Sequence, residues 1–167
     1  MNDVEPWAGL PNARFGETRE ALRDRLGEHS SFRRSDGEPL TDHYVADGLL
    51  LGFDRADVLA MIEGTKRSGL SLAGVQLVGR PFGEVLADLA EAGFEAVVDE
   101  SGCVIERQGI ALYAAAPDEP EEDVEGAAVF SRTAWAAHFG SSPEAGSAPV
   151  ETQQAQDEEK ELGDTLF

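Results

Sequence analysis

The sequence is poor in the residues that build disulfides and metal centres. It contains 1 cysteine, Cys103, and 3 histidines among 167 residues. One cysteine cannot form an internal disulfide, and no two histidines stand at the spacing of zinc ligands. We therefore expect a fold without disulfides, and neither a metal ion nor another cofactor.

Long apolar runs are also missing. No stretch approaches the roughly 20 consecutive apolar residues that a membrane-spanning helix needs. The first residues, MNDVEPWAGLPNARFGE, are acidic and lack the basic-then-apolar order of a secretory signal. Together with the single cysteine, these absences predict a protein of the reducing cytoplasm.

Common catalytic motifs are absent as well. The sequence has no Gly-x-Ser-x-Gly and no Gly-x-Gly-x-x-Gly, and its acidic runs lack the alternating oxygens of a calcium loop. Asp42 and His43 form one candidate acid–base pair, since a neighbouring carboxylate can orient and charge an imidazole. The alternative is a solvated strand end. We expect a non-enzyme, and keep a ligand pocket or active site near Asp42 and His43 as the alternative.

Basic residues are few beside the acidic ones. The chain has 13 Lys and Arg against 33 Asp and Glu, which gives a formal net charge of -20. Such a field repels polyphosphates and anionic membranes, so we expect neither a nucleic acid nor a membrane as partner. Two interpretations remain. The charge serves solubility, or it presents an acidic surface to a basic protein, such as a toxin or an enzyme whose cleft it fills.

Apolar periodicity predicts an α+β protein made of two tandem units. The first unit, residues 1–63, has a helix with Phe15, Leu22 and Leu26 at near-helical spacing, then an antiparallel meander around the turn Asp47-Gly48. Its fourth strand, 58–63, has a short helix as the alternative. Residues 64–74 contain three glycines and are predicted to be a linker.

The second unit, residues 75–140, follows the same plan. Its helix carries an apolar stripe that includes Phe82, Val85 and Leu89, and short strands and a closing helix follow. Beyond Gly140 the composition turns to Ser, Pro, Glu, Gln, Ala and Gly. Such a stretch cannot offset its ordering entropy by burial, so we predict a disordered acidic tail over 141–167.

The two units align with one another. Residues 20–26 align with 83–89, and 48–51 with 109–112, at a nearly constant separation. This pattern favours a duplicated supersecondary unit; chance similarity between two amphipathic helices is the alternative. Two such units joined edge to edge would place the helices on one sheet face and leave the other open, in one sheet or in two adjoining sheets.

The string VQLVGRPFGEVLADL, with the later GIALYAAA, resembles a known module. It is similar to the helix-plus-antiparallel-sheet unit found in tandem in the beta-lactamase inhibitory protein family, and to small bacterial immunity-type proteins. The resemblance implies a binding or inhibitory protein. Because the chain lacks the secreted inhibitor's disulfides and signal peptide, we expect its target inside the cell.

Strand alternation leaves open which sheet face meets a partner. We predict that the open face binds it through Tyr44, Asp47, Glu106, Arg107 and Tyr113, because aromatic and arginine side chains dominate interface energetics. Core packing is the alternative for both tyrosines. In the tail, Leu162, Leu166 and Phe167 form a candidate docking motif, which would make the protein an adaptor or chaperone; a random terminus is the alternative.

Overall fold

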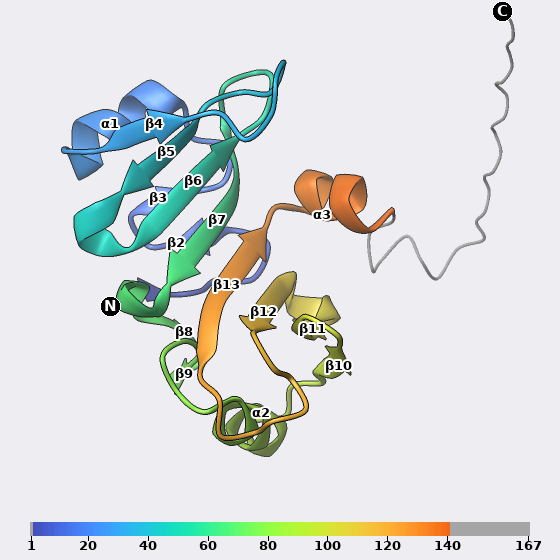
Figure 1. Ribbon diagram of the computed structural model, residues 1–167. Helices are drawn as coiled ribbons and strands as arrows, with labels where there is room; N and C mark the ends of the chain where they lie inside the picture. Colours follow the sequence, from blue (N-terminus) through green and yellow to red (C-terminus); the bar gives the residue numbers. More distant parts are fainter. Residues whose placement is uncertain (1, 141–167) are drawn as a thin grey trace, which may run out of the picture.

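The structure is a computed structural model that describes residues 2–140 (Figure 1). The predicted tail, with Leu162, Leu166 and Phe167, lies outside the described residues. The fold is α+β, with one large antiparallel sheet and two small sheets. The α-helices are α1 (Arg19–Leu26), α2 (Phe82–Glu91) and α3 (Arg132–Phe139). None of the helices in the described part of the chain combines the length and the apolar character that crossing a bilayer requires.

The large sheet has 8 strands in the order β10-β11-β12-β13-β7-β6-β5-β4, and all neighbours are antiparallel. The bounds of its strands are β4 (Ser30–Phe32), β5 (Thr41–Tyr44), β6 (Leu49–Phe53), β7 (Leu59–Thr65), β10 (Val97–Asp99), β11 (Gly102–Ile105), β12 (Ile110–Ala114) and β13 (Val124–Phe130). The predicted strand at 58–63 is therefore confirmed, and it pairs with β13 at the centre of the sheet.

The predicted linker 64–74 is wrong, because this segment is built into the fold. It holds the end of β7, the 3-10 turn η2 (Lys66–Ser68) and strand β8 (Leu70–Leu72), which has every residue buried. Strand β8 pairs with β1 (Asn2–Asp3) and β9 (Val75–Gln76) in a small sheet. The glycines serve as turns: Gly69 and Gly74 have φ of +67° and +85°. Strands β2 (Gly9–Leu10) and β3 (Ala13–Arg14) form the other small sheet.

The two faces of the large sheet carry different helices (Figure 1). Helices α1 and α2 contribute Leu22, Phe82 and Leu89 to the main core, together with Ile62 and Val129 from the central strands. Side chains alternate along a strand, so the neighbours of these residues point to the opposite face. There α3 packs Trp135 against a second, smaller core that contains Ala111, Ala128 and Phe130. We call this second side the α3 face.

Local sequence signals account for the starts of α1 and α3 and for the buried side of α2. The Thr18 side chain accepts a hydrogen bond from the Ala21 amide at the start of α1, and Ser131 does the same for Ala134 at the start of α3. The apolar stripe predicted for the second helix is confirmed, since Phe82, Val85 and Leu89 are the buried residues of α2.

The order of elements recurs along the chain. Helix α1 is followed by β4, β5, the 3-10 turn η1 (Val45–Asp47), β6 and β7, and α2 is followed by β10, β11, the 3-10 turn η3 (Glu106–Gln108), β12 and β13. Gly16 donates to the Leu59 carbonyl at 2.9 Å, and Gly79 donates to the Val124 carbonyl at 2.9 Å. Each segment that leads into a helix thus donates a hydrogen bond to the first residue of a central strand, β7 for the segment before α1 and β13 for the segment before α2.

Candidate functional site

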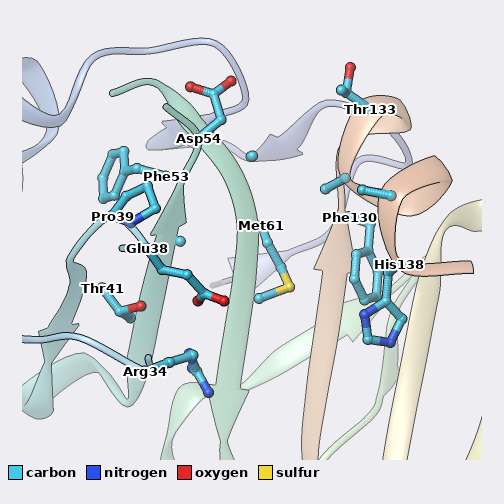
Figure 2. A pocket seen from close by; sticks show the side chains of 14 residues that line it. Arg34, Glu38, Pro39, Thr41, Phe53, Asp54, Met61, Phe130, Thr133 and His138 are labelled. Carbon is cyan, nitrogen blue, oxygen red and sulfur yellow. The ribbon is translucent and has the colours of Figure 1, made fainter. Parts of the chain in front are cut away.

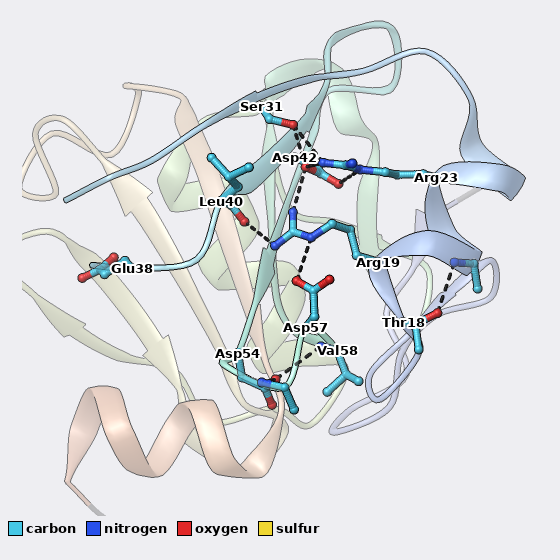
Figure 3. Close-up of polar contacts among 12 residues, drawn as sticks. Thr18, Arg19, Arg23, Ser31, Glu38, Leu40, Asp42, Asp54, Asp57 and Val58 are labelled. Atoms are coloured by element: carbon cyan, nitrogen blue, oxygen red, sulfur yellow. Dashed lines mark hydrogen bonds and ion pairs between the residues drawn. The ribbon is translucent and has the colours of Figure 1, made fainter. Parts of the chain in front are cut away.

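A cluster of charged side chains around one buried carboxylate joins α1 to the sheet (Figure 3). Asp42 on β5 is fully buried, and its carboxylate accepts hydrogen bonds from Arg19 at 2.9 Å, from Arg23 at 2.8 Å and from Ser31 at 2.9 Å. The two arginines are one helical turn apart, so both reach the same carboxylate. Arg19 also donates to Asp57 at 2.8 Å. We call these five residues the Asp42 cluster.

The Asp42 cluster holds its acid ionised. Burial raises the pKa of the Asp42 carboxyl, but hydrogen bonds from Arg23 and Ser31 and the charges of Arg19 and Arg23 outweigh it, so the net pKa lies below its usual value. Arg19 is 8% exposed, and its guanidinium lies 4.2 Å from the centre of the Phe53 ring. Every charge is engaged inside the fold, which is the pattern of a structural ion-pair network.

The candidate acid–base pair of Asp42 and His43 is wrong, and the alternative of a solvated strand end is wrong for Asp42, which is buried. Neighbouring residues of a strand point to opposite faces. Asp42 therefore lies under α1, whereas half-buried His43 lies on the α3 face, where it is paired across the strands with Leu50 and Ser30. A ligand cannot meet both side chains at once.

A hollow of about 400 Å³ opens on the α3 face, between α3 and the strands β5, β6 and β7 (Figure 2). Met61 and Phe130, which face each other across the pairing of β7 with β13, form its apolar floor. Ala134 and Ala137 line it from α3, and Pro39 lines it from the connection between β4 and β5. We call this feature the α3 hollow. Its volume lies in the range of sites that take up a small molecule or an anchoring side chain.

Polar groups stand around the α3 hollow, and Arg34, Asp54 and His138 among them have partners within the fold. Arg34 forms an ion pair with Glu63 at 2.8 Å. The Asp54 carboxylate accepts hydrogen bonds from the amides of Ala56 and Val58, at 2.9 and 3.3 Å, which fixes the turn between β6 and β7. His138 packs its ring against Phe130, with ring centres 5.3 Å apart. These groups can orient a bound apolar group, and they do not form a nucleophile–base pair.

Two other hollows on the described surface have similar volumes, about 410 and 430 Å³. The first lies beside α2 and is lined by Arg80 and Asp88, which form an ion pair at 2.7 Å. The second lies beside η1 and includes Val45 and Arg67. Volume therefore does not distinguish the α3 hollow from the other two. It differs from them in having an apolar floor on two neighbouring strands and a helix along one side.

The two predicted contact tyrosines have different positions. Tyr44 is 1% exposed and lies in the main core, so core packing, the stated alternative, describes it, and its ring is not on the surface. Its hydroxyl is the one buried side-chain polar atom without a hydrogen bond within residues 2–140. Tyr113 on β12 is 38% exposed on the α3 face. Burial and the nearby acids Glu63 and Asp99 raise the pKa of the Tyr113 hydroxyl.

The remaining predicted contact residues are exposed but do not converge. Asp47 lies on η1, and Gly48 after it accepts a hydrogen bond from Thr65, at one end of β7. Glu106 and Arg107 lie on η3, and Gly109 after it accepts a hydrogen bond from Phe130, at the far end of β13. Thr65 pairs with Gly126 and Met61 with Phe130, so the two turns stand at opposite ends of the central strand pair.

Residues 2–140 support neither a reactive thiol at Cys103 nor a metal-binding site. Cys103 is buried, and burial together with Asp99 raises the pKa of its thiol to about 12, which keeps it protonated at neutral pH. No group of three or more His, Cys, Asp or Glu side chains in this range is placed to hold a metal ion.

Comparison with protein-family models, with curated proteins and with solved structures found no match to this chain.

Proposed function

We propose that this protein is a non-catalytic binding module, an inhibitor or immunity-type protein that covers a basic partner protein with its α3 face. The observation that carries the proposal is the α3 hollow. It offers an apolar floor of Met61 and Phe130 beside a sheet face that no further helix covers within residues 2–140. Such a hollow fits one large apolar side chain, and anchors of that kind provide most of the energy of a protein interface.

The surroundings of the α3 hollow suit a protein better than a metabolite. Side chains of the α3 face form a row across the strands beside the hollow. This row runs through Val97, Val104, Ala111, Ala128, Glu63, Leu50, His43 and Ser30. Ala111 and Ala128 are buried beside Trp135, and the other side chains of the row mix apolar and polar groups, which is the composition of a non-obligate interface. Of the two predicted contact tyrosines, only Tyr113 is exposed on this face, and we propose that it contacts the partner.

The charge of the chain supports a basic partner. A net charge of -20 attracts a cationic surface over a distance of about one Debye length, roughly 8 Å at physiological salt. Opposite charges mainly raise the rate of association and set the choice of partner, while the apolar anchor limits dissociation. Asp47 and Glu106, at opposite ends of the central strand pair, would then contact separate parts of a broad partner surface.

We also infer that the protein arose by duplication of one helix-and-meander unit. The recurrent element order, the matching bonds from Gly16 and Gly79, and the left-handed glycines Gly48 and Gly109 after η1 and η3 support this inference. Joining two such units through β7 and β13 removes one exposed edge from each and makes one wide sheet face. A wide face is what a protein inhibitor needs.

Peptide selection tests the proposed binding site. A phage-displayed library of random peptides is panned against the full chain, and enriched peptides are measured by fluorescence anisotropy. We expect peptides with one large apolar residue near Lys or Arg. Ala137→Phe, at an exposed position that lines the α3 hollow, should weaken their binding about tenfold, or about 1.4 kcal/mol.

Ala87→Phe is the matched control, because Ala87 is an exposed alanine of α2 on the other side of the sheet. It should leave peptide affinity unchanged. A library that yields no such peptides, or peptides that bind the Ala137→Phe protein as tightly as the unsubstituted chain, would overturn the assignment of the α3 hollow.

A further inference from the structure

Strand β10 ends the large sheet with an edge that is apolar and unpaired. Among residues 2–140 its strand partner is β11, and no second strand adjoins it. Val97 and Val98 are 65% and 51% exposed, and they belong to the small set of large apolar side chains on the described surface. Edge strands are usually protected by short length, by charged side chains such as lysine, by proline or by a bulge. β10 (Val97–Asp99) is short and ends at Asp99, but it contains neither lysine nor proline.

Both sides of this edge can accept an added strand. Val97 begins the row of the α3 face and stands beside half-buried Val104. Val98 pairs with Cys103 and points toward the side that α2 covers. A strand placed next to β10 would therefore find a valine on each face, as well as free backbone donors and acceptors along the edge.

Acidic side chains surround these two valines. Glu95, Asp99 and Glu100 are exposed, and none of the three forms an ion pair within residues 2–140. Residues 75–140 as a whole contain 13 acidic and 3 basic residues. A second copy of the chain would bring the same acids against this edge, so like charges disfavour self-pairing here.

We propose that the outer edge of β10 takes up, by strand addition, an extended segment of a partner protein in which apolar residues alternate with Lys or Arg. Such a segment has its apolar side chains on one face and its cations on the other. The apolar residues pack beside Val98, the cations lie on the side of Val97 and Asp99, near the exposed Glu95 and Glu100, and the backbones form a new pair of strands. This site lies at the far end of the sheet from the α3 hollow, which is built on β5, β6, β7 and β13.

The opposite edge of the sheet lacks this chemistry. Strand β4 consists of Ser30, Ser31 and Phe32, and it is followed directly by Arg33 and Arg34. Two arginines at that edge repel a basic segment, whereas the acids at β10 attract it. The two free edges of one sheet are thus distinguished by charge.

A short synthetic peptide of alternating lysine and valine is the probe. We expect it to bind the full chain in fluorescence anisotropy, and to slow hydrogen exchange at the amides of Val97–Asp99 while leaving Ser30–Phe32 unchanged. Val98→Lys should weaken binding about tenfold or more, because it replaces an apolar contact by a like charge. A peptide with glutamate in place of lysine should not bind.

Val45→Lys is the matched control. Val45 is 55% exposed on η1, near Ser30 of β4 at the end of the sheet opposite β10, so the substitution adds the same charge and leaves β10 intact. Equal peptide affinity of the two lysine variants would reduce the effect to general charge attraction and overturn the proposal. Slower hydrogen exchange at the amides of β4 would also overturn it, and so would a dimer of the unsubstituted chain that Val98→Lys dissociates.

Hydrogen exchange on the unsubstituted chain identifies the binding site even if a variant fails to fold. The Ala137→Phe protein should still bind this peptide, so the two sites can fail separately.

Discussion

At the scale of single residues, Asp42 is the one buried acidic side chain within residues 2–140. Its carboxylate is fully buried and accepts hydrogen bonds from two arginines and one serine. A buried ion pair is a weak source of net stability, because taking both charges out of water costs about as much as their attraction returns. Removing the Asp42 charge is different, because buried Arg19 then keeps only the exposed Asp57 as an ion-pair partner, and the partly buried Arg23 loses its ion pair.

We therefore predict that Asp42→Asn destabilises the protein by about 3–5 kcal/mol at pH 7. The substitution keeps the shape of the side chain and removes the charge that Arg19 and Arg23 share. Urea unfolding followed by circular dichroism measures the loss. Asp47→Asn, at an exposed position on η1, is the control and should change stability little.

The same cluster predicts the direction of the acid response. The folded-state pKa of Asp42 lies below that of the unfolded chain, which is about 3.9. Its contribution is therefore fully present above about pH 4 and is lost as the pH falls through the folded-state value. The difference between the unsubstituted protein and the Asp42→Asn variant should shrink at pH 3. A difference that stays constant with pH would contradict this account.

The residues of the sites show where sequence reasoning succeeded and where it failed. The sequence predicts correctly that Tyr113 lies on a strand, but the choice of Tyr44 as a partner contact is wrong, because Tyr44 is buried and both registers of its strand are apolar. The partners of Asp42 come from a helix that lies far along the chain, so local pattern could not show its burial. One signal was present: Arg19 and Arg23 stand one turn apart in the helix that also buries Leu22.

At the scale of elements, the packing of α3 on the sheet depends mainly on one side chain, that of Trp135. Trp135 is 2% exposed, and its ring centre lies 4.0 Å from that of Phe139, 5.5 Å from Phe130 and 5.8 Å from Trp7. These aromatic contacts fasten α3 to the sheet and close one side of the α3 hollow. A helix of 8 residues is too short to be stable without such packing.

We predict that Trp135→Ala costs about 3–5 kcal/mol, as is usual for removal of a buried tryptophan. The α3 hollow should lose its helical wall at the same time. Trp7, the one other tryptophan, would lose its neighbour, so the emission of the variant should shift to longer wavelength. Phe139→Ala, at a position that is 40% exposed, should cost clearly less. Equal effects of the two substitutions would show that α3 is held by something other than Trp135.

Most of the helices and strands could be predicted from local pattern, and the exceptions have a common cause. The stripe of α2 and the meander strands are encoded in neighbouring residues. Strand β8 is short, lies between glycines and pairs in parallel with β1, with Leu70 opposite Asn2. A pairing between such distant parts of the chain leaves no local signal, so a buried strand was taken for a linker. The α3 hollow could not be predicted for the same reason, since Met61 and Phe130 meet through a long-range strand pair.

At the scale of the whole molecule, charge is distributed unevenly. Residues 1–74 contain 13 acidic and 9 basic residues, whereas residues 75–140 contain 13 acidic and only 3 basic ones. Residues 1–74 can balance their acids locally, as the Asp42 cluster and the pair of Arg34 with Glu63 do. In residues 75–140 repulsion among acids is largely uncompensated, and it opposes the compact state.

This asymmetry predicts the response of stability to salt. Raising NaCl from about 0.01 M to about 0.1 M shortens the Debye length from about 30 Å to about 10 Å, which screens exposed charges far more than the buried Asp42 cluster. The melting temperature of the unsubstituted protein should therefore rise. At low salt, Glu121→Gln should raise the melting temperature by relieving repulsion in the acidic loop of residues 117–123, between β12 and β13. Glu20→Gln, at an exposed position in the first turn of α1, should lower it slightly, because an acid there stabilises the helix. Thermal unfolding of the three proteins at both salt concentrations measures these shifts. A melting temperature that falls with salt would mean that the attraction within ion pairs outweighs the repulsion among acids across the fold. The acids of residues 75–140 would then be compensated within the protein, and their excess would no longer support a basic partner.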